Sequence, residues 1–282
     1  MTEKTFLVRL INIDRRILFF ILIGLQVIIL IRPLGLPVVI EPMVRSAYDT
    51  IESIPDDAIV PVVVDLDPGS WGETKPANVA VMKHLIKRNL KLVMFSIHQE
   101  APPLVTELLD AVQPQLDQYG YEYGKDYVYV GFFSGLASAI LGLAESWDEM
   151  VTADAYGTPA SDLPILEGIQ TIDDFYKEGT VVIGGCLTGS LWVPHWCSTH
   201  GGKLVYSPNA KCAIGLVQYY VMGHVRGIIP GIIGGAQYEA LTGALGEATK
   251  QNDMISASVL ICLGYLLVGN IAYFGTKGGN KK

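Results

Sequence analysis

The chain has 282 residues, half of them hydrophobic, and a formal net charge of −8 at pH 7. This length suits one domain with additions or two small domains. The acidic balance, with no basic stripe to neutralise phosphates, argues against a nucleic-acid partner. The mean hydropathy of +0.35 is high for a purely soluble protein, and the excess lies near the two ends.

The first apolar segment follows a short basic tail, 1–16. Its uncharged core runs from Ile17 to Ile31. It reaches the length of a membrane span, about 20 residues, if the helix continues past Arg32 to Leu36. No small-x-small cleavage pattern follows, so we predict a transmembrane anchor over 17–36 rather than a cleaved signal.

The second apolar segment, 254–275, has no charged residue inside and is predicted to be a second anchor, followed by a basic tail, 276–282. Basic residues flank the outer side of each anchor, and such flanks face the cytoplasm. All acidic residues except Glu3 and Asp14 lie between the anchors. We therefore predict a membrane protein with both termini cytoplasmic, an extracytoplasmic main domain over 37–253, and the lipid bilayer as a partner.

Between the anchors, short apolar runs alternate with segments of helical periodicity. Strands are predicted at 59–64, 90–97, 127–132, 180–183 and 203–206, with helices at 77–88, 102–119, 134–144 and 190–200. Such alternation produces a parallel sheet with helices on both faces. The predicted fold class is α/β: a Rossmann-like, doubly wound, mostly parallel sheet of about five strands, flanked by N- and C-terminal transmembrane helices.

Two stretches do not fit this alternation. Residues 145–177 contain acidic residues and prolines, and we predict that they fold over one sheet edge or onto a neighbour. Residues 213–244 are apolar and glycine-rich, which is typical of a segment at the membrane surface or in a subunit contact. The candidate interface residues are Gly227, Gly231, Gly234 and Gly235. The expected partners are further copies of the chain or other membrane subunits.

Ligands of open parallel sheets bind beyond the carboxyl ends of the strands. Several predicted strands of this chain end in polar or glycine-rich residues, and these ends would converge on one edge, which we call the rim. The candidate ligand-binding residues at the rim are Ser96, His98, Gly131, Ser134, Gly185, Thr188 and Ser190.

Asp65 and Asp67 directly follow the first predicted strand. The pair resembles the first motif of the haloacid-dehalogenase phosphatases. That resemblance implies that Asp65 is a nucleophile, Asp67 a general acid, Mg²⁺ the cofactor, and Ser96 the residue ending the second strand. Gly69 departs from that family, which has Thr or Val there, and no later acidic pair is evident. We favour the alternative, in which the carboxylates cap the turn and the next helix and no cofactor is needed.

Four residues of metal-ligand type lie close together in the sequence: Cys186, His195, Cys197 and His200. Their spacing matches no common structural zinc module, and two interleaved tryptophans favour a packing role. A nucleophilic Cys–His pair is a further hypothesis for this cluster. Whether Cys186 and Cys197 form a disulfide stays open.

The order of these elements resembles a prokaryotic family of membrane-anchored α/β proteins of unknown function. The resemblance rests on five segments: Asp65–Gly69, Tyr123–Tyr129, Gly157–Pro159, Gly234–Leu241 and the span from Met254. It implies a fold and a membrane location, and it implies no activity.

Three functions are hypotheses at this point. The first is a non-enzymatic, membrane-anchored assembly subunit in an oligomeric complex. The second is a membrane-tethered, Mg²⁺-dependent hydrolase of phosphatase type that uses Asp65 and Asp67. The third is a ligand-binding sensor module, which requires an open cleft.

Overall fold

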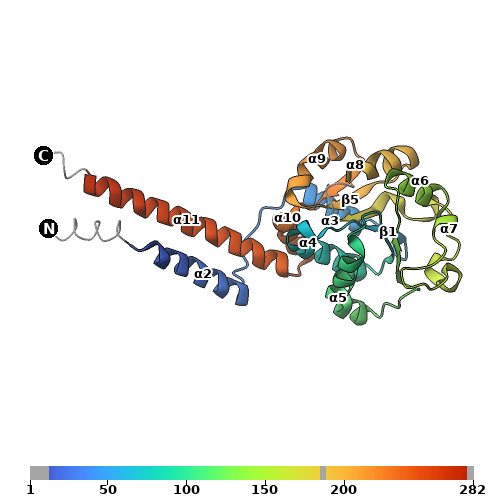
Figure 1. Cartoon of the computed structure of the whole chain (residues 1–282), viewed down its shortest axis with the longest axis horizontal. Coiled ribbons are helices and arrows are strands. Elements are labelled where there is room, and N and C mark those ends of the chain that lie inside the picture. The colour runs from blue at the N-terminus through green and yellow to red at the C-terminus, as the bar shows by residue number, and fades with distance from the viewer. Residues whose placement is uncertain (1–12, 185–188, 278–282) are drawn as a thin grey trace. The chain divides into compact units, whose positions relative to one another are not determined.

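The computed structural model describes residues 13–184 and 189–277, which form two compact units (Figure 1). The helical unit contains α2 (Arg15–Ile31) and most of α11 (Glu247–Lys277). The sheet unit covers Val38–Ala248. The chain therefore leaves one unit at Pro37 and returns to it within α11.

Six parallel strands build the sheet, in the order β3-β2-β1-β4-β5-β6. They are β1 (Ile59–Val64), β2 (Lys91–Ser96), β3 (Tyr127–Phe132), β4 (Thr180–Ile183), β5 (Leu204–Ser207) and β6 (Val225–Ile228). From β1 the chain winds outward first through β2 and β3 and then, in the other direction, through β4, β5 and β6. The predicted α/β class with a parallel sheet is confirmed, but the predicted five strands omit β6.

The central strand β1 has the sequence IVPVVV and is buried along nearly its whole length. Continuous β-branched residues are typical of parallel strands that are covered on both faces. Pro61 lacks a backbone N–H and is unusual inside a central strand. Here the pairing of β1 with β4 begins only at Val62, so Pro61 lies just outside the part of β1 that is paired on both sides.

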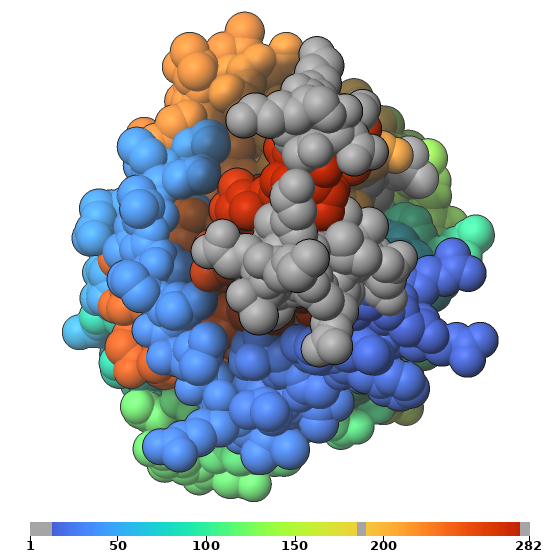
Figure 2. Space-filling model, turned by 90° about the vertical axis from the view of Figure 1, so that its left-hand side faces the viewer, coloured from blue at the N-terminus to red at the C-terminus, as the bar shows by residue number. Residues whose placement is uncertain are grey.

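Helices cover both faces of the sheet, and each face has its own apolar core. The first face packs against α3 (Pro42–Glu52), α4 (Pro68–Lys87), α5 (Ala101–Tyr119) and α10 (Gly231–Thr242). The second face packs against α6 (Ala137–Glu145), α8 (Gly189–Trp192), the π-helix η5 (Val193–Ser198) and α9 (Ala210–Val221). Figure 2 shows light-blue residues around α3 at the surface beside orange residues of the later sheet unit, in keeping with the contacts of α3 with β6 and α10.

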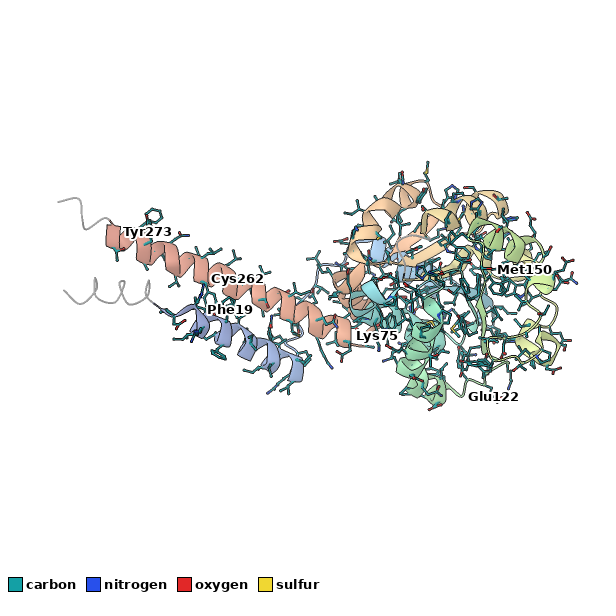
Figure 3. All side chains as sticks on the ribbon, in the orientation of Figure 1. Phe19, Lys75, Glu122, Met150, Cys262 and Tyr273 are labelled. Carbon is teal, nitrogen blue, oxygen red and sulfur yellow. The ribbon has the colours of Figure 1, made fainter. Side chains whose placement is uncertain are left out.

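The excursion between α6 and β4 contains no strand of the sheet. It consists of α7 (Trp147–Met150) and four short 3-10 helices, η1 (Ala160–Asp162), η2 (Pro164–Leu166), η3 (Ile172–Asp174) and η4 (Lys177–Gly179). Its apolar side chains, among them Ile165, Ile172 and Phe175, join the second core. The excursion thus folds onto the second face of the same chain's sheet, near Met150 in Figure 3.

The glycine-rich segment 213–244 supplies the end of α9, then β6 and α10. Its four candidate interface glycines make close contacts inside the chain, and their role in contacts between subunits stays a prediction. A Cβ on Gly227 would lie 2.2 Å from the backbone nitrogen of Ala47, and one on Gly235 would lie 2.9 Å from the Cβ atoms of Ala77 and Ala248. Gly231 is close to the Glu73 carboxylate, and Gly234 is close to Pro230.

Within the helical unit, α2 and α11 run antiparallel beside each other. The Gln26 amide donates to the Ser258 hydroxyl at 2.9 Å, and the Tyr265 hydroxyl donates to the carbonyl of Leu18 at 3.0 Å. Most apolar side chains of both helices remain exposed, as around Phe19 and Cys262 in Figure 3. The outer surface of this helix pair is therefore far more apolar than the outer surface of a helix pair that faces water.

One helix in the described part of the chain is long and apolar enough to span a membrane, over Glu247–Thr276. The predicted N-terminal span over 17–36 is not found there, because α2 has 17 residues and ends at Ile31. The Asp253 carboxylate accepts hydrogen bonds from the backbone N–H groups of Gly35 and Leu36 at 2.8 and 3.1 Å. These bonds hold the residues after Arg32 in a non-helical conformation, which sequence periodicity does not reveal.

Candidate functional site

The carboxyl ends of all six strands lie at one edge of the sheet, because every strand pair is parallel. The sheet changes direction between β1 and β4, and ligands of open α/β sheets bind at such a switch point. The centre of the candidate site therefore lies where β1 and β4 end, at Val64 and Ile183. Gly185 and Thr188 of the predicted rim lie outside the described residues, as does Cys186.

Asp65 is fully buried at the end of β1 and joins three elements. One carboxylate oxygen accepts a hydrogen bond from the backbone N–H of Ile97 at 2.9 Å. The other accepts from the indole N–H of Trp192 in α8 at 2.8 Å. A buried carboxylate that is hydrogen-bonded in this way crosslinks the chain. Sequence reasoning missed Trp192 as its partner, since the two residues are 127 positions apart.

Asp67 is the N-cap of α4. Its carboxylate accepts hydrogen bonds from the Ser70 backbone N–H at 2.9 Å and from the Ser70 hydroxyl at 2.5 Å. The capping role predicted for Asp67 is confirmed, and it follows from the free N–H groups that begin every helix. Both aspartates of the phosphatase-like pair thus make hydrogen bonds that hold the loop after β1.

Ser96 and His98 form the turn that leads from β2 into α5. The Ser96 hydroxyl is buried, donates to the carbonyl of His98 at 3.0 Å and accepts from its backbone N–H at 3.1 Å. The His98 ring accepts from the backbone N–H of Glu100 at 3.4 Å. The structure therefore places both side chains at the predicted edge, where they stabilise a turn.

The remaining described rim residues differ in exposure. Gly131 is buried with φ = +102°, a conformation that favours glycine, and it lies where β2 and β3 shift register. Ser134 and Ser190 are exposed. At the switch point, Gly184 has φ = +78°, and a Cβ there would lie 2.4 Å from the Leu66 side chain. Gly184, the first residue after β4, therefore packs directly against Leu66 in the loop after β1.

Two cavities are formed by described residues elsewhere in the sheet unit. One, of about 520 Å³, lies in the excursion and is lined in part by Trp147, Asp162 and Glu167. The other, of about 510 Å³, lies beside α3 and is lined in part by Arg45 and Arg226. Neither contains a predicted rim residue.

The candidate metal ligands on and after η5 point to different neighbours. The Cys197 thiol is buried 3.9 Å from the carbonyl of His224, and burial raises its pKa to about 12. His200 lies 3.7 Å from the Glu145 carboxylate. Among the described residues, no three His, Cys, Asp or Glu side chains come close enough to hold a metal ion. Cys197 is a free cysteine, which excludes a bridge to Cys186, whereas Cys212 is disulfide-bonded.

A buried polar cluster joins α3, α4 and α10, and sequence reasoning did not find it. One ring nitrogen of His84 lies 2.6 Å from the Tyr238 hydroxyl, and the other lies 2.8 Å from the Glu52 carboxylate. Tyr48 stacks on the His84 ring, with centroids 4.9 Å apart. Burial lowers the pKa of His84 below 6.5, so the neutral ring accepts from Tyr238 and donates to Glu52.

Acidification is expected to lower the free energy of unfolding through His84. Because its pKa is lower in the folded than in the unfolded state, the unfolded state takes up the proton first. The contribution of neutral His84 is therefore full above pH 6.5 and is lost as the pH falls toward the lowered pKa. Urea unfolding followed by circular dichroism, near neutral pH and near pH 5, measures this loss.

The matched control is His84→Gln, which keeps a donor and an acceptor and does not titrate. It should show a smaller loss of stability on acidification. Equal pH dependence in both proteins would contradict the prediction, because it would show that the titration of His84 does not contribute to the loss of stability.

Comparison of the chain with models of protein families, with curated proteins and with solved structures finds no match. The resemblance to membrane-anchored α/β proteins of unknown function stays a prediction from the sequence motifs.

Proposed function

We propose that this chain is a membrane-anchored assembly subunit of an oligomeric membrane complex, with an extracytoplasmic Rossmann-like, doubly wound domain. The observation that carries the proposal is the helical unit. Helices that expose apolar side chains on most sides are suited to lipid rather than to water. α11 supplies the span, and α2 lies antiparallel beside it in the same bilayer.

The contacts between α2 and α11 support this arrangement. Polar side chains in lipid need partners from neighbouring helices, and Gln26 and Ser258 provide such a pair. The 17 residues of α2 correspond to about 25 Å of helix, close to the thickness of the hydrocarbon core, about 30 Å. An antiparallel pair in the bilayer puts both basic tails on one side, consistent with cytoplasmic termini.

The disulfide at Cys212 supports an extracytoplasmic sheet unit, because disulfides persist in oxidising compartments. The basic residues that flank the outer sides of the two apolar segments also agree with that side of the membrane.

The rim favours assembly over hydrolysis. A nucleophilic Asp65 would need a carboxylate oxygen that faces a substrate. Instead, its two carboxylate oxygens accept hydrogen bonds from the backbone N–H of Ile97 and the indole N–H of Trp192. Asp67 is likewise engaged by Ser70. These hydrogen bonds give both aspartates a structural role. They therefore support a domain that functions through contacts at its surface.

Membrane insertion is tested by alkaline carbonate extraction of cell membranes that contain the full chain. The wild type should stay in the pellet. The double variant Leu263→Lys, Leu267→Lys should move to the supernatant, because a lysine at the centre of a span costs about 2.5–3.5 kcal/mol. The control Leu245→Lys places one lysine on an exposed leucine before α11, outside the span, and should stay in the pellet. Release of the wild type would contradict the anchor.

Assembly is tested separately by native mass spectrometry of the full chain in mild detergent. The expected result is an oligomer with a defined number of copies or other subunits. A monomer that still resists carbonate extraction would contradict the assembly role but not the membrane anchor.

A further inference from the structure

The cavity beside α3 has walls of a different chemistry from those of the cavity in the excursion. Its volume of about 510 Å³ is within the range of small-molecule sites. Every described residue that lines it, except Pro42, has a polar side chain. The described lining of the excursion cavity instead combines apolar side chains with three carboxylates and contains no lysine, arginine or histidine. An apolar ligand would leave the polar groups beside α3 without partners, so this cavity is suited to a polar ligand.

Three elements of the sheet unit supply the charged groups of the cavity beside α3. Arg45 and Asp49 come from α3. Glu178 comes from η4, and Arg226 comes from β6. The Ser46 hydroxyl joins α3 to β6, because it donates to the backbone carbonyl of Arg226. The walls of the cavity are therefore held together by the fold, and the charged side chains are not needed for that contact.

The two positive and two negative side chains of the cavity are hardly engaged with one another. A guanidinium nitrogen of Arg226 lies 3.9 Å from the Glu178 carboxylate, which is beyond hydrogen-bonding distance. Within the described part of the chain, Arg45 and Asp49 form no ion pair, although they lie one turn apart on α3. All four side chains are exposed. Their donors and acceptors are therefore available to a ligand.

The balance of charge around the cavity favours a neutral ligand. An anionic group that approaches Arg226 would also meet Glu178, which is close to it. A cationic group that approaches Asp49 would meet Arg45 one turn away. Guanidinium groups only donate hydrogen bonds and carboxylates only accept them, so a neutral group that does both can use each pair in full. Hydroxyl groups have this property.

The hydroxyl groups of α3 add further acceptors along the same wall. The Thr50 hydroxyl donates to the carbonyl of Ser46 at 2.7 Å, and the Ser53 hydroxyl donates to the carbonyl of Thr50 at 2.7 Å. Each hydroxyl gives its only proton to the backbone, so its oxygen is left as an acceptor. The half-buried Tyr176 also lines the cavity and has an aromatic ring with an apolar face. Such a face suits the C–H groups of a sugar ring.

We propose that the cavity beside α3 is a binding site for a neutral saccharide. The carboxylates of Asp49 and Glu178 accept hydrogen bonds from the sugar hydroxyls. The guanidinium groups of Arg45 and Arg226 donate to the oxygens of the same hydroxyls. This site goes beyond the proposed assembly role and does not depend on it, because all the lining residues belong to the sheet unit.

Isothermal titration calorimetry of the full chain with neutral saccharides tests the site. The probes are maltotriose, cellotriose and tri-N-acetylchitotriose, in a polyoxyethylene detergent that has no sugar head group. At least one of them should bind. Glycine and inorganic phosphate are the charged comparison probes, and neither should bind. Binding of glycine or phosphate but of none of the saccharides would overturn the proposal, as would the absence of binding by every probe.

Two double variants locate the bound saccharide. Arg45→Ala with Arg226→Ala removes the donors, and Asp49→Ala with Glu178→Ala removes the acceptors. Each double variant should weaken binding roughly tenfold or more, because hydrogen bonds to charged groups are the strong ones. The thermal unfolding midpoint should not fall in either variant, since all four side chains are exposed.

The matched controls change the same number of charges at exposed sites outside the cavity. Lys83→Ala with Lys211→Ala removes two positive charges. Asp110→Ala with Glu149→Ala removes two negative charges. Both controls should bind the saccharide as the wild type does. Binding that is unchanged in the cavity variants, or weakened only by the loss of the arginines, would overturn the site. A monomer in native mass spectrometry would contradict the assembly role and leave this result unaffected.

Discussion

Asp65→Ala is expected to lower the free energy of unfolding by about 3–5 kcal/mol, because it removes the acceptor for two buried N–H groups. The backbone N–H of Ile97 and the indole N–H of Trp192 both point at this carboxylate. In the variant they would stay buried without that partner. Chemical unfolding of the full chain in detergent, followed by circular dichroism, measures the change.

Two further variants separate the contributions. Trp192→Phe removes one donor, keeps a large aromatic ring and leaves the bond from Ile97, so it should cost less than Asp65→Ala. The double variant should cost less than the sum of the two, since the partners share one interaction. Asp65→Ala with unchanged stability and a lost hydrolytic activity would instead restore the phosphatase hypothesis.

The elements around Asp65 show what the sequence can predict. The predicted strands over 59–64, 127–132 and 180–183 match β1, β3 and β4 to the residue, because long apolar β-branched or aromatic runs are typical of buried parallel strands. The capping role of Asp67 was also predictable, since it depends on residues close in sequence. The bond between Asp65 and Trp192 was not, because it depends on where α8 lies over the sheet.

The sequence analysis did not predict strand β6, for a different reason. β6 has the sequence VRGI, which is short and contains a charged residue and a glycine. Its extended conformation depends on pairing with β5 and on α3 packing directly over Gly227. Tertiary contacts therefore decide this element, as they also decide the end of α2, where Asp253 binds the chain after the helix. The periodicity of the local sequence therefore predicts neither strand β6 nor the end of α2.

The contact between α3 and β6 leads to the second large effect. Gly227→Ala is expected to lower the free energy of unfolding by about 3 kcal/mol or more, beyond the usual cost of one added methyl in a core. The new Cβ would lie 2.2 Å from the nitrogen and 2.3 Å from the Cα of Ala47. Both are backbone atoms, so no side-chain rotation relieves the overlap and α3 must move away from the sheet.

The matched control is Gly72→Ala in α4, where a Cβ meets nothing within 4 Å. That change should raise stability by roughly 0.5–1 kcal/mol, since alanine favours a helix more than glycine does. Thermal unfolding of both variants in the same detergent gives the comparison. Ala47→Gly should not rescue Gly227→Ala, because the overlap with the backbone of α3 persists. Rescue would show that only the Ala47 methyl is crowded and that α3 can adjust. Failure of rescue would establish direct backbone packing of α3 on β6, the edge strand at the opposite side of the sheet from β3.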